Sequence, residues 1–174
     1  GMKCGGEQTI RVVVTQAAWD KLAPRIKAND DVRPEAVYES LNVMEVDPRE
    51  RFTVNCDTQL ITVRDDLDLT AITAFRLLAA RLKGQGASNP ILLKDCLAFG
   101  ETPLESNIAL LRASVVIGSL LCDGLGDTIR VSLTEDSPNE IAVCNDLIEQ
   151  IYELTDAETD VSRVALAYDP FDYQ

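Results

Sequence analysis

The sequence predicts an α/β fold in which a mainly parallel sheet is flanked by helices. In the second half of the chain, short β-branched runs alternate with apolar-periodic helical runs at the spacing of βα units. Two of these helices have a marked start, because TPLE (102–105) and SPNE (137–140) each match a capping box with proline at the first helical position. Parallel strands joined in this way are connected by right-handed crossovers.

The first elements are short. Residues 1–8 begin with what resembles a tag remnant, Gly-Met, and we expect them to form a disordered lead-in. The β-branched run TIRVVVT (9–15) predicts a strand. The following residues, 16–28, predict a helix that Pro24 shortens or kinks, with Trp19 toward the core.

The central part gives weaker strand signals and one clear helix. A short strand is expected within 40–46, and 51–64 contains two strand-like stretches that either pair as a hairpin or run on. Apolar residues recur at helical spacing in 69–83, which predicts a helix. Asp68 is its expected N-cap, and Gly84 is expected to follow its end in the left-handed conformation.

The last elements complete one predicted domain, 9–168, and 169–174 would begin a linker. The apolar run NPILLK predicts a buried strand, and mixed or apolar patterns predict a strand at 128–134 and another at 162–168. The two capped helices should cover 103–123 and 138–154.

Composition argues against several classes of function. The chain has 29 acidic and 16 basic residues and a net charge of −13, which would repel the phosphates of nucleic acids. We therefore expect no nucleic-acid partner. We also expect no membrane span, because no apolar run approaches roughly 20 residues.

Cysteine and histidine usage narrows the chemistry further. The five cysteines include no C-x-x-C pair, and with no secretory signal they are expected to be reduced thiols in the cytoplasm. Cys56, Cys122 and Cys144 lie in apolar-periodic segments and should be small core residues. The absence of histidine excludes Ser-His-Asp and Cys-His catalysis and the usual zinc sites.

The predicted strand TIRVSLT (128–134) has one polar face. Arg130 and Ser132 share that face, although a parallel strand covered on both sides is normally almost all apolar. At the carboxyl end of a strand, a guanidinium and a hydroxyl could together hold an anionic group. Alternatively, Arg130 is internal and pairs with an acidic neighbour, for example on the preceding turn.

Two further cations follow strand-like runs. Arg64 ends QLITVR and Lys94 ends PILLK, so each is expected at a strand's carboxyl end. If these ends are adjacent to that of Arg130, the three cations would focus a phosphate site despite the acidic net charge. If they are not adjacent, each simply ends its strand in solvent.

The segment IGSLLCDGLGDTIRVSLTEDSPNEIAVCNDLI (117–148) resembles the 4-hydroxy-3-methylbut-2-enyl diphosphate synthase family of the non-mevalonate isoprenoid pathway. It is similar to that family's pattern of a small-residue helix, then D-G-[LI]-G-D-T-I-R-V-S-L-[TS] and an acidic helix start. Residues 61–93 and the final YDPFDYQ show a weaker similarity to the family.

The resemblance implies a TIM-barrel-like or partial-barrel fold. Family members bind a cyclic diphosphate on a TIM barrel and reduce it with a 4Fe–4S cluster held by a separate domain. A large form of the family inserts an extra α/β domain between the two. By this resemblance Arg130 and Ser132 would hold the diphosphate, and Arg64 and Lys94 would also bind the substrate. The chain itself would carry no cofactor, and the remaining domains of the full-length enzyme would be its partners.

Departures from the family pattern limit the expected function. The chain lacks the family's cysteine cluster and barrel histidine, it reads DCLAFGE where the family has a TEAG turn, and 9–58 match no barrel segment. It is therefore expected to be a domain or fragment of such a synthase that is not catalytically complete alone. It would be either the inserted domain or the C-terminal part of the barrel. The alternative is a non-catalytic, acidic α/β module that binds a partner protein.

Overall fold

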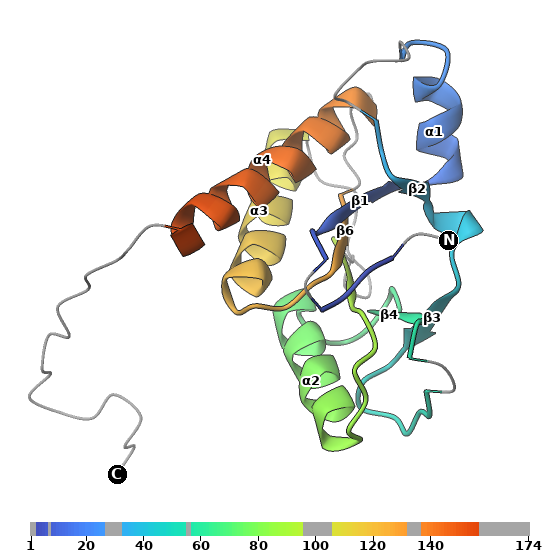
Figure 1. Ribbon diagram of the computed structural model, residues 1–174, viewed down its shortest axis with the longest axis vertical. Coiled ribbons are helices and arrows are strands. Elements are labelled where there is room, and N and C mark those ends of the chain that lie inside the picture. The colour runs from blue at the N-terminus through green and yellow to red at the C-terminus, as the bar shows by residue number, and fades with distance from the viewer. Residues whose placement is uncertain are drawn as a thin grey trace, which may run out of the picture.

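The structure is a computed structural model, which describes residues 3–6, 8–26, 33–54, 57–95, 106–131 and 137–156. Helices and strands alternate along these ranges, and the sheet lies beside a row of helices (Figure 1). The elements are β1 (Arg11–Val14), α1 (Gln16–Leu22), β2 (Ala36–Val37), η1 (Tyr38–Ser40, a 3-10 turn), β3 (Val43–Val46), β4 (Leu60–Val63), α2 (Ala71–Gly84), β5 (Leu92–Lys94), α3 (Ser106–Cys122), β6 (Thr128–Arg130) and α4 (Ser137–Asp156).

All strand pairs among the described residues are parallel, which confirms the predicted sheet. One ladder has the order β2-β1-β6-β5, and β3 pairs with β4 in a second. A single parallel bridge between Ile61 and Ile91 connects the two ladders through β4 and β5. The strands therefore follow one another in the order β2-β1-β6-β5-β4-β3.

This order makes the sheet a partial barrel. Its two outermost strands, β2 and β3, are consecutive in the sequence and are joined only by η1 and residues 41–42. The hydroxyl of Tyr38 in η1 also donates a hydrogen bond to Glu45 of β3. The two edges of the sheet are thus tied together by the chain itself, and this confirms the expected partial barrel.

Helices cover the strands and enclose one core. α2 packs against β4 and α3, α3 packs against α4, and α4 packs against α1 and β1 (Figure 1). Leu22 of α1 is buried, whereas Trp19, which was expected to face the core, is only partly buried and packs against it. The largest fully buried apolar side chains are Phe75, Leu22, Ile61, Leu78, Leu92, Leu93, Ile117, Leu120, Ile129 and Ile141.

The boundaries of α2 differ from those predicted. The N-cap is Thr70 and not Asp68, because Thr70 has the extended backbone of a cap and its hydroxyl accepts a hydrogen bond from the backbone N–H of Thr73. At the other end the helix includes Gly84, and Gly86 adopts the left-handed conformation, with φ +67°.

The segment 51–64 contains one described strand and no hairpin. β4 pairs in parallel with β3, and the backbone N–H of Leu60 donates to the carbonyl of Asn42. β3 precedes β4 in the chain and is its parallel partner. β4 therefore does not form the hairpin within 51–64 that was one of the two possibilities. The predicted strand near 40–46 is confirmed as β3, although the residues before it form η1.

Several predicted features lie at or beyond the limits of the described residues. Of the lead-in, Cys4 lies against the sheet, where its sulfur accepts a hydrogen bond from the Thr128 hydroxyl at 3.5 Å. α4 begins at Ser137, in agreement with the SPNE signal. The TPLE box, the strand 162–168 and the linker 169–174 lie outside the described residues.

Two other sequence expectations concern cysteines and membranes. Cys144 is buried at 1% exposure as predicted, but Cys122, the last residue of α3, is exposed. Cys56 lies outside the described residues. Within the described part of the chain, no helix combines the length and apolar character that crossing a membrane requires.

Candidate functional site

A polar cluster lies at the carboxyl ends of the parallel strands. Because parallel strands end on the same side of a sheet, the residues that finish β3, β4, β5 and β6 come together there. We call this group the strand-end cluster. It consists of Tyr38, Glu45, Asp65, Lys94 and Arg130.

Lys94 is the buried centre of the strand-end cluster. Its side chain is 1% exposed, and its Nζ lies 3.0 Å from Glu45 Oε1 and 3.0 Å from Asp65 Oδ2. The two carboxylates are 42% and 49% exposed. Burying an ammonium is costly unless it is paired, and here two acceptors offset that cost while they remain partly hydrated. The carboxylates therefore stand between Lys94 and solvent.

Arg130 lies beside Lys94 in the sheet. The two residues are register partners in the β5–β6 ladder, so of the two possibilities left open by the sequence these two strand ends are adjacent. The guanidinium carbon of Arg130 lies 4.9 Å from the centre of the Tyr38 ring, a distance typical of a cation–π contact. Its Nε is buried and has no hydrogen-bond partner among the described residues.

Tyr38 and Glu45 form a polarised pair at the rim of the strand-end cluster. Burial, together with the hydrogen bond to Glu45, raises the pKa of the Tyr38 hydroxyl. Burial alone would raise the pKa of Glu45, but hydrogen bonds from Tyr38 and Lys94 outweigh it and hold that pKa below its usual value. At neutral pH, Glu45 is therefore an ionised acceptor of two donors.

Arg64 belongs to a neighbouring ion pair and not to the strand-end cluster. It lies 3.4 Å from Asp47, whose side chain is 3% exposed and is also contacted by Arg49 at 2.8 Å. Hydrogen bonds from Arg49, opposed in part by burial, lower the pKa of Asp47 to about 2. Of the four predicted site residues the structure thus brings Lys94 and Arg130 together and turns Arg64 to Asp47, while Ser132 lies outside the described residues.

The DGLGD turn before β6 has structural contacts. Asp123 pairs with Arg76 of α2 at 2.7 Å, and Asp127 accepts a hydrogen bond from the Ile91 backbone N–H at 2.8 Å. Gly126 has φ +110°, and a Cβ there would lie 2.5 Å from Leu93 Cδ1. Neither aspartate is the described partner of Arg130, so the turn fixes β6 against β5 and α2.

Sequence reasoning missed the acidic half of the strand-end cluster. Glu45 stands in the otherwise apolar strand VMEV, and Asp65 directly follows LITVR. The charged residue inside the short apolar strand VMEV is a signal that could have identified Glu45. With two cations and two carboxylates, the strand-end cluster is electrically balanced and can hold the strand ends in register. The described residues contain no group of three side chains suited to holding a metal ion.

The chain is similar in sequence to known proteins of one family. The family model of the GcpE TIM-barrel domain matches residues 3–145, so the expectation that 9–58 correspond to no barrel segment was wrong. A 4-hydroxy-3-methylbut-2-en-1-yl diphosphate synthase (flavodoxin) of Akkermansia muciniphila is 37% identical over 141 residues, which are 78% of this chain and 23% of the relative.

Two other relatives give a similar result. The corresponding flavodoxin-type synthase of Bacteroides thetaiotaomicron is 32% identical over 132 residues, 75% of this chain and 20% of the relative. A ferredoxin-type synthase of Synechococcus elongatus is 38% identical over 81 residues, 46% of this chain and 18% of the relative. The chain thus spans about a fifth of the length of these relatives.

Proposed function

The chain belongs to the GcpE TIM-barrel domain family, and we propose that it works as a positioning domain of a 4-hydroxy-3-methylbut-2-enyl diphosphate synthase. In this role it would space and orient the catalytic domains, which are its proposed partners, and would not turn over substrate alone. Of the two possibilities raised by the sequence, this corresponds to the inserted domain.

One observation carries the proposal: the ammonium of Lys94 is already held by two carboxylates of the same chain. A diphosphate that approached this end of the sheet would meet Glu45 and Asp65 before it reached Lys94. Like charges repel, and displacing the carboxylates would forfeit their ion pairs with a buried cation. The strand-end cluster therefore supports a structural role more than an anion-binding one.

A second candidate function rests on Arg130. Its buried Nε lacks a hydrogen-bond partner among the described residues, and Ser132 follows two positions later. A diphosphate held by Arg130 and Ser132, with Lys94 and Arg64 nearby, would supply acceptors for this guanidinium. This is the substrate-binding site that the family resemblance implies.

Calorimetric titration with pyrophosphate separates the two functions. For a positioning domain, the natural chain should give no binding heat at millimolar pyrophosphate. The double variant Glu45→Gln/Asp65→Asn, which removes the competing carboxylates, should bind measurably. The matched control Glu50→Gln/Asp57→Asn changes two exposed carboxylates elsewhere and should stay silent. Binding by the natural chain that Arg130→Ala abolishes would instead establish the diphosphate site.

We place the synthase's iron–sulfur cluster outside this chain. Such clusters need organised cysteine ligands. The described cysteines do not meet that need: Cys4 contacts Thr128, Cys122 is exposed on α3 and Cys144 is buried in α4. We also propose a cytoplasmic location, where unpaired thiols are kept reduced. After anaerobic reconstitution with iron and sulfide, the chain should remain colourless, and stoichiometric iron with cluster absorbance would contradict this assignment.

A further inference from the structure

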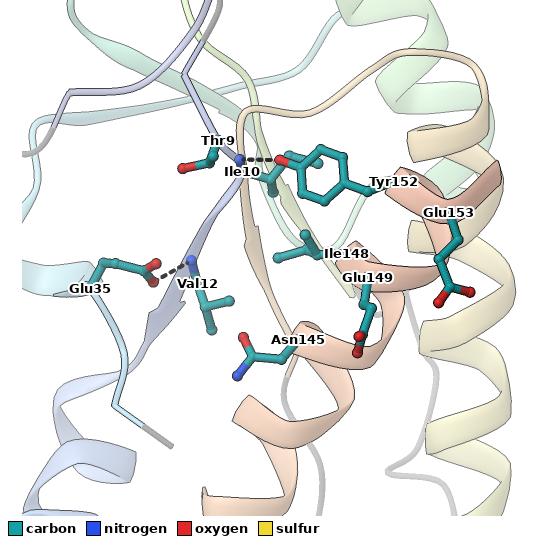
Figure 2. A pocket seen from close by; sticks show the side chains of 9 residues that line it. All are labelled: Thr9, Ile10, Val12, Glu35, Asn145, Ile148, Glu149, Tyr152 and Glu153. Carbon is teal, nitrogen blue, oxygen red and sulfur yellow. Dashed lines mark hydrogen bonds between the residues drawn. The ribbon is translucent and has the colours of Figure 1, made fainter. Parts of the chain in front are cut away.

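A groove of about 690 Å³ runs between the start of β1 and α4, away from the strand-end cluster (Figure 2). One wall is formed by residues 9–12. The other is one face of α4, where Asn145, Ile148, Glu149, Tyr152 and Glu153 follow one another at helical spacing. The proposed positioning function does not involve this groove.

The β1 wall of the groove is a strand edge that lacks a full partner strand. The backbone N–H of Glu35, which precedes β2, donates to the Val12 carbonyl at 3.0 Å, and β2 itself is register-paired only with Val13 and Val14 of β1. Just before them, the backbone N–H of Ile10 donates to the Tyr152 hydroxyl at 3.1 Å, and that of Val12 donates to Glu35 Oε2 at 2.8 Å. Figure 2 shows both contacts. Two amide donors, two residues apart on the same edge, are therefore occupied by side-chain oxygens.

This spacing matches what an added strand would offer. In an extended strand, alternate residues direct their backbone groups to the same edge, so two carbonyls two residues apart could replace the oxygens of Glu35 and Tyr152. Strand addition at an exposed sheet edge is a common mode of peptide recognition, in which main-chain hydrogen bonds supply affinity. Both oxygens belong to side chains, so exchanging them for peptide carbonyls would leave the β1–β2 register pairs intact.

The negative charge of the groove indicates which kind of peptide would bind there. Among the described residues, three carboxylates line it, those of Glu35, Glu149 and Glu153, and no lysine or arginine does. Between them lie the apolar side chains of Ile10, Val12 and Ile148. A second copy of this chain, with its net charge of −13, would bring further negative charge to this surface.

We propose that the groove binds an extended segment of a partner protein that alternates lysine or arginine with apolar residues and adds to the edge of β1. The basic side chains lie against the three carboxylates, and the apolar ones pack on Ile10 and Ile148. The peptide carbonyls take over the N–H groups of Ile10 and Val12.

Fluorescence anisotropy with the full chain and labelled peptides tests this proposal. The probe is Thr-Lys-Val-Lys-Val-Lys-Thr. A glutamate peptide, Thr-Glu-Val-Glu-Val-Glu-Thr, controls for charge. A proline peptide, Thr-Lys-Pro-Lys-Pro-Lys-Thr, keeps all three lysines but cannot pair as a strand, because each proline lacks a backbone N–H. We expect the lysine peptide to bind at least tenfold more tightly than either control, and to slow hydrogen exchange at the amides of Ile10 and Val12.

Two variants of the groove should change this affinity in opposite directions. Glu149→Lys/Glu153→Lys should weaken binding of the lysine peptide at least tenfold, whereas the matched control Glu50→Lys/Asp57→Lys should leave it within twofold. Tyr152→Phe removes the internal acceptor that competes for the Ile10 N–H, so it should tighten binding severalfold. Circular dichroism verifies that each variant is folded.

Three results would overturn the proposal. Equal binding of the lysine and proline peptides, without slower exchange at Ile10 and Val12, would mean simple charge attraction to the surface. Displacement of the lysine peptide by a peptide of residues 157–174 would assign the groove to the chain's own C-terminal segment. A dimer that dissociates in Glu149→Lys/Glu153→Lys would assign it to a second copy. The pyrophosphate titration is independent of all three.

Discussion

The strand-end cluster and the β1–α4 groove use carboxylates in opposite ways. At the strand ends, Glu45 and Asp65 face a lysine that is 1% exposed, and the charges balance within the molecule. In the groove, Glu35 accepts only a backbone N–H, and no cation pairs with Glu149 or Glu153 among the described residues. The difference indicates that the first region is complete in itself, whereas the second presents its charge outward.

Solvation explains why the two arrangements can coexist. Lys94 is removed from water, so it requires close acceptors, and removing them would leave a buried charge uncompensated. The groove carboxylates are hydrated and carry no such requirement. Substitutions should therefore affect stability strongly at the strand ends and weakly in the groove.

The largest effect is expected from Glu45→Gln/Asp65→Asn. The two substitutions keep the side-chain volumes but remove both negative charges from a buried ammonium, so the free energy of unfolding should fall by about 3 kcal/mol. Urea denaturation measures this loss. Glu50→Gln/Asp57→Asn, at two exposed positions, should change stability by less than about 0.5 kcal/mol. A loss below about 1 kcal/mol for the variant at Glu45 and Asp65 would remove the contrast between the two regions.

Asp47→Asn should come next, with a loss of about 1–2 kcal/mol at neutral pH, because charge-assisted hydrogen bonds from Arg49 are weakened. The pKa of Asp47 is about 2 in the folded chain, below its ordinary 3.8. Its contribution to stability is therefore fully present above about pH 4 and is lost as the pH falls toward 2. Urea denaturation of both proteins between pH 2 and 7 should show their difference shrinking over that window. A constant difference would contradict the ion pair.

Tyr38→Phe should cost about 1 kcal/mol. The substitution keeps the ring beneath Arg130 but removes the hydroxyl that donates to Glu45. Because that hydrogen bond helps to lower the pKa of Glu45, the pKa should rise in the variant, which carboxylate titration by NMR would detect. An unchanged Glu45 titration would mean that Lys94 alone sets its ionisation.

The same substitution in the groove, Tyr152→Phe, should have the smallest effect. The Ile10–Tyr152 hydrogen bond is exposed, so water can replace the hydroxyl, and the loss should stay below about 0.5 kcal/mol. Thermal denaturation of the two phenylalanine variants side by side gives the comparison directly. A larger loss for Tyr152→Phe than for Tyr38→Phe would show that the groove is part of the stabilising framework.

Much of the fold could be predicted from local patterns. Periodicity identified the long helices and the parallel sheet, and the positions of Lys94 and Arg130 at strand ends followed from the sequence. The carboxylates that pair with Lys94 could not be predicted in this way. Glu45 reaches Lys94 only because β3 pairs with β4 and β4 meets β5 at Ile61, and no local signal specifies these long-range pairings. The contacts of Arg64 were missed for the same reason.

The remaining differences come from competition between near-equivalent residues. Asp68 and Thr70 are both good N-caps, and the choice depends on where the chain leaves β4. Gly84 and Gly86 both permit a left-handed residue, and because the helix includes Gly84 it is Gly86 that takes this conformation. Cys122 follows the apolar pattern of α3 but falls at its last turn, where burial depends on the packing of the following DGLGD turn.

The pairing of β1 with β6 has a consequence for biosynthesis. Arg11 of β1 is register-paired with Thr128 of β6, so one edge of β1 stays unpaired until β6 has been synthesised. Contacts between such distant residues slow folding, because a long loop must close before they form. During translation the β-branched run RVVV would emerge early with that edge open, a state prone to aggregation. A ribosome-bound chain should therefore depend on chaperones until β6 has left the exit tunnel.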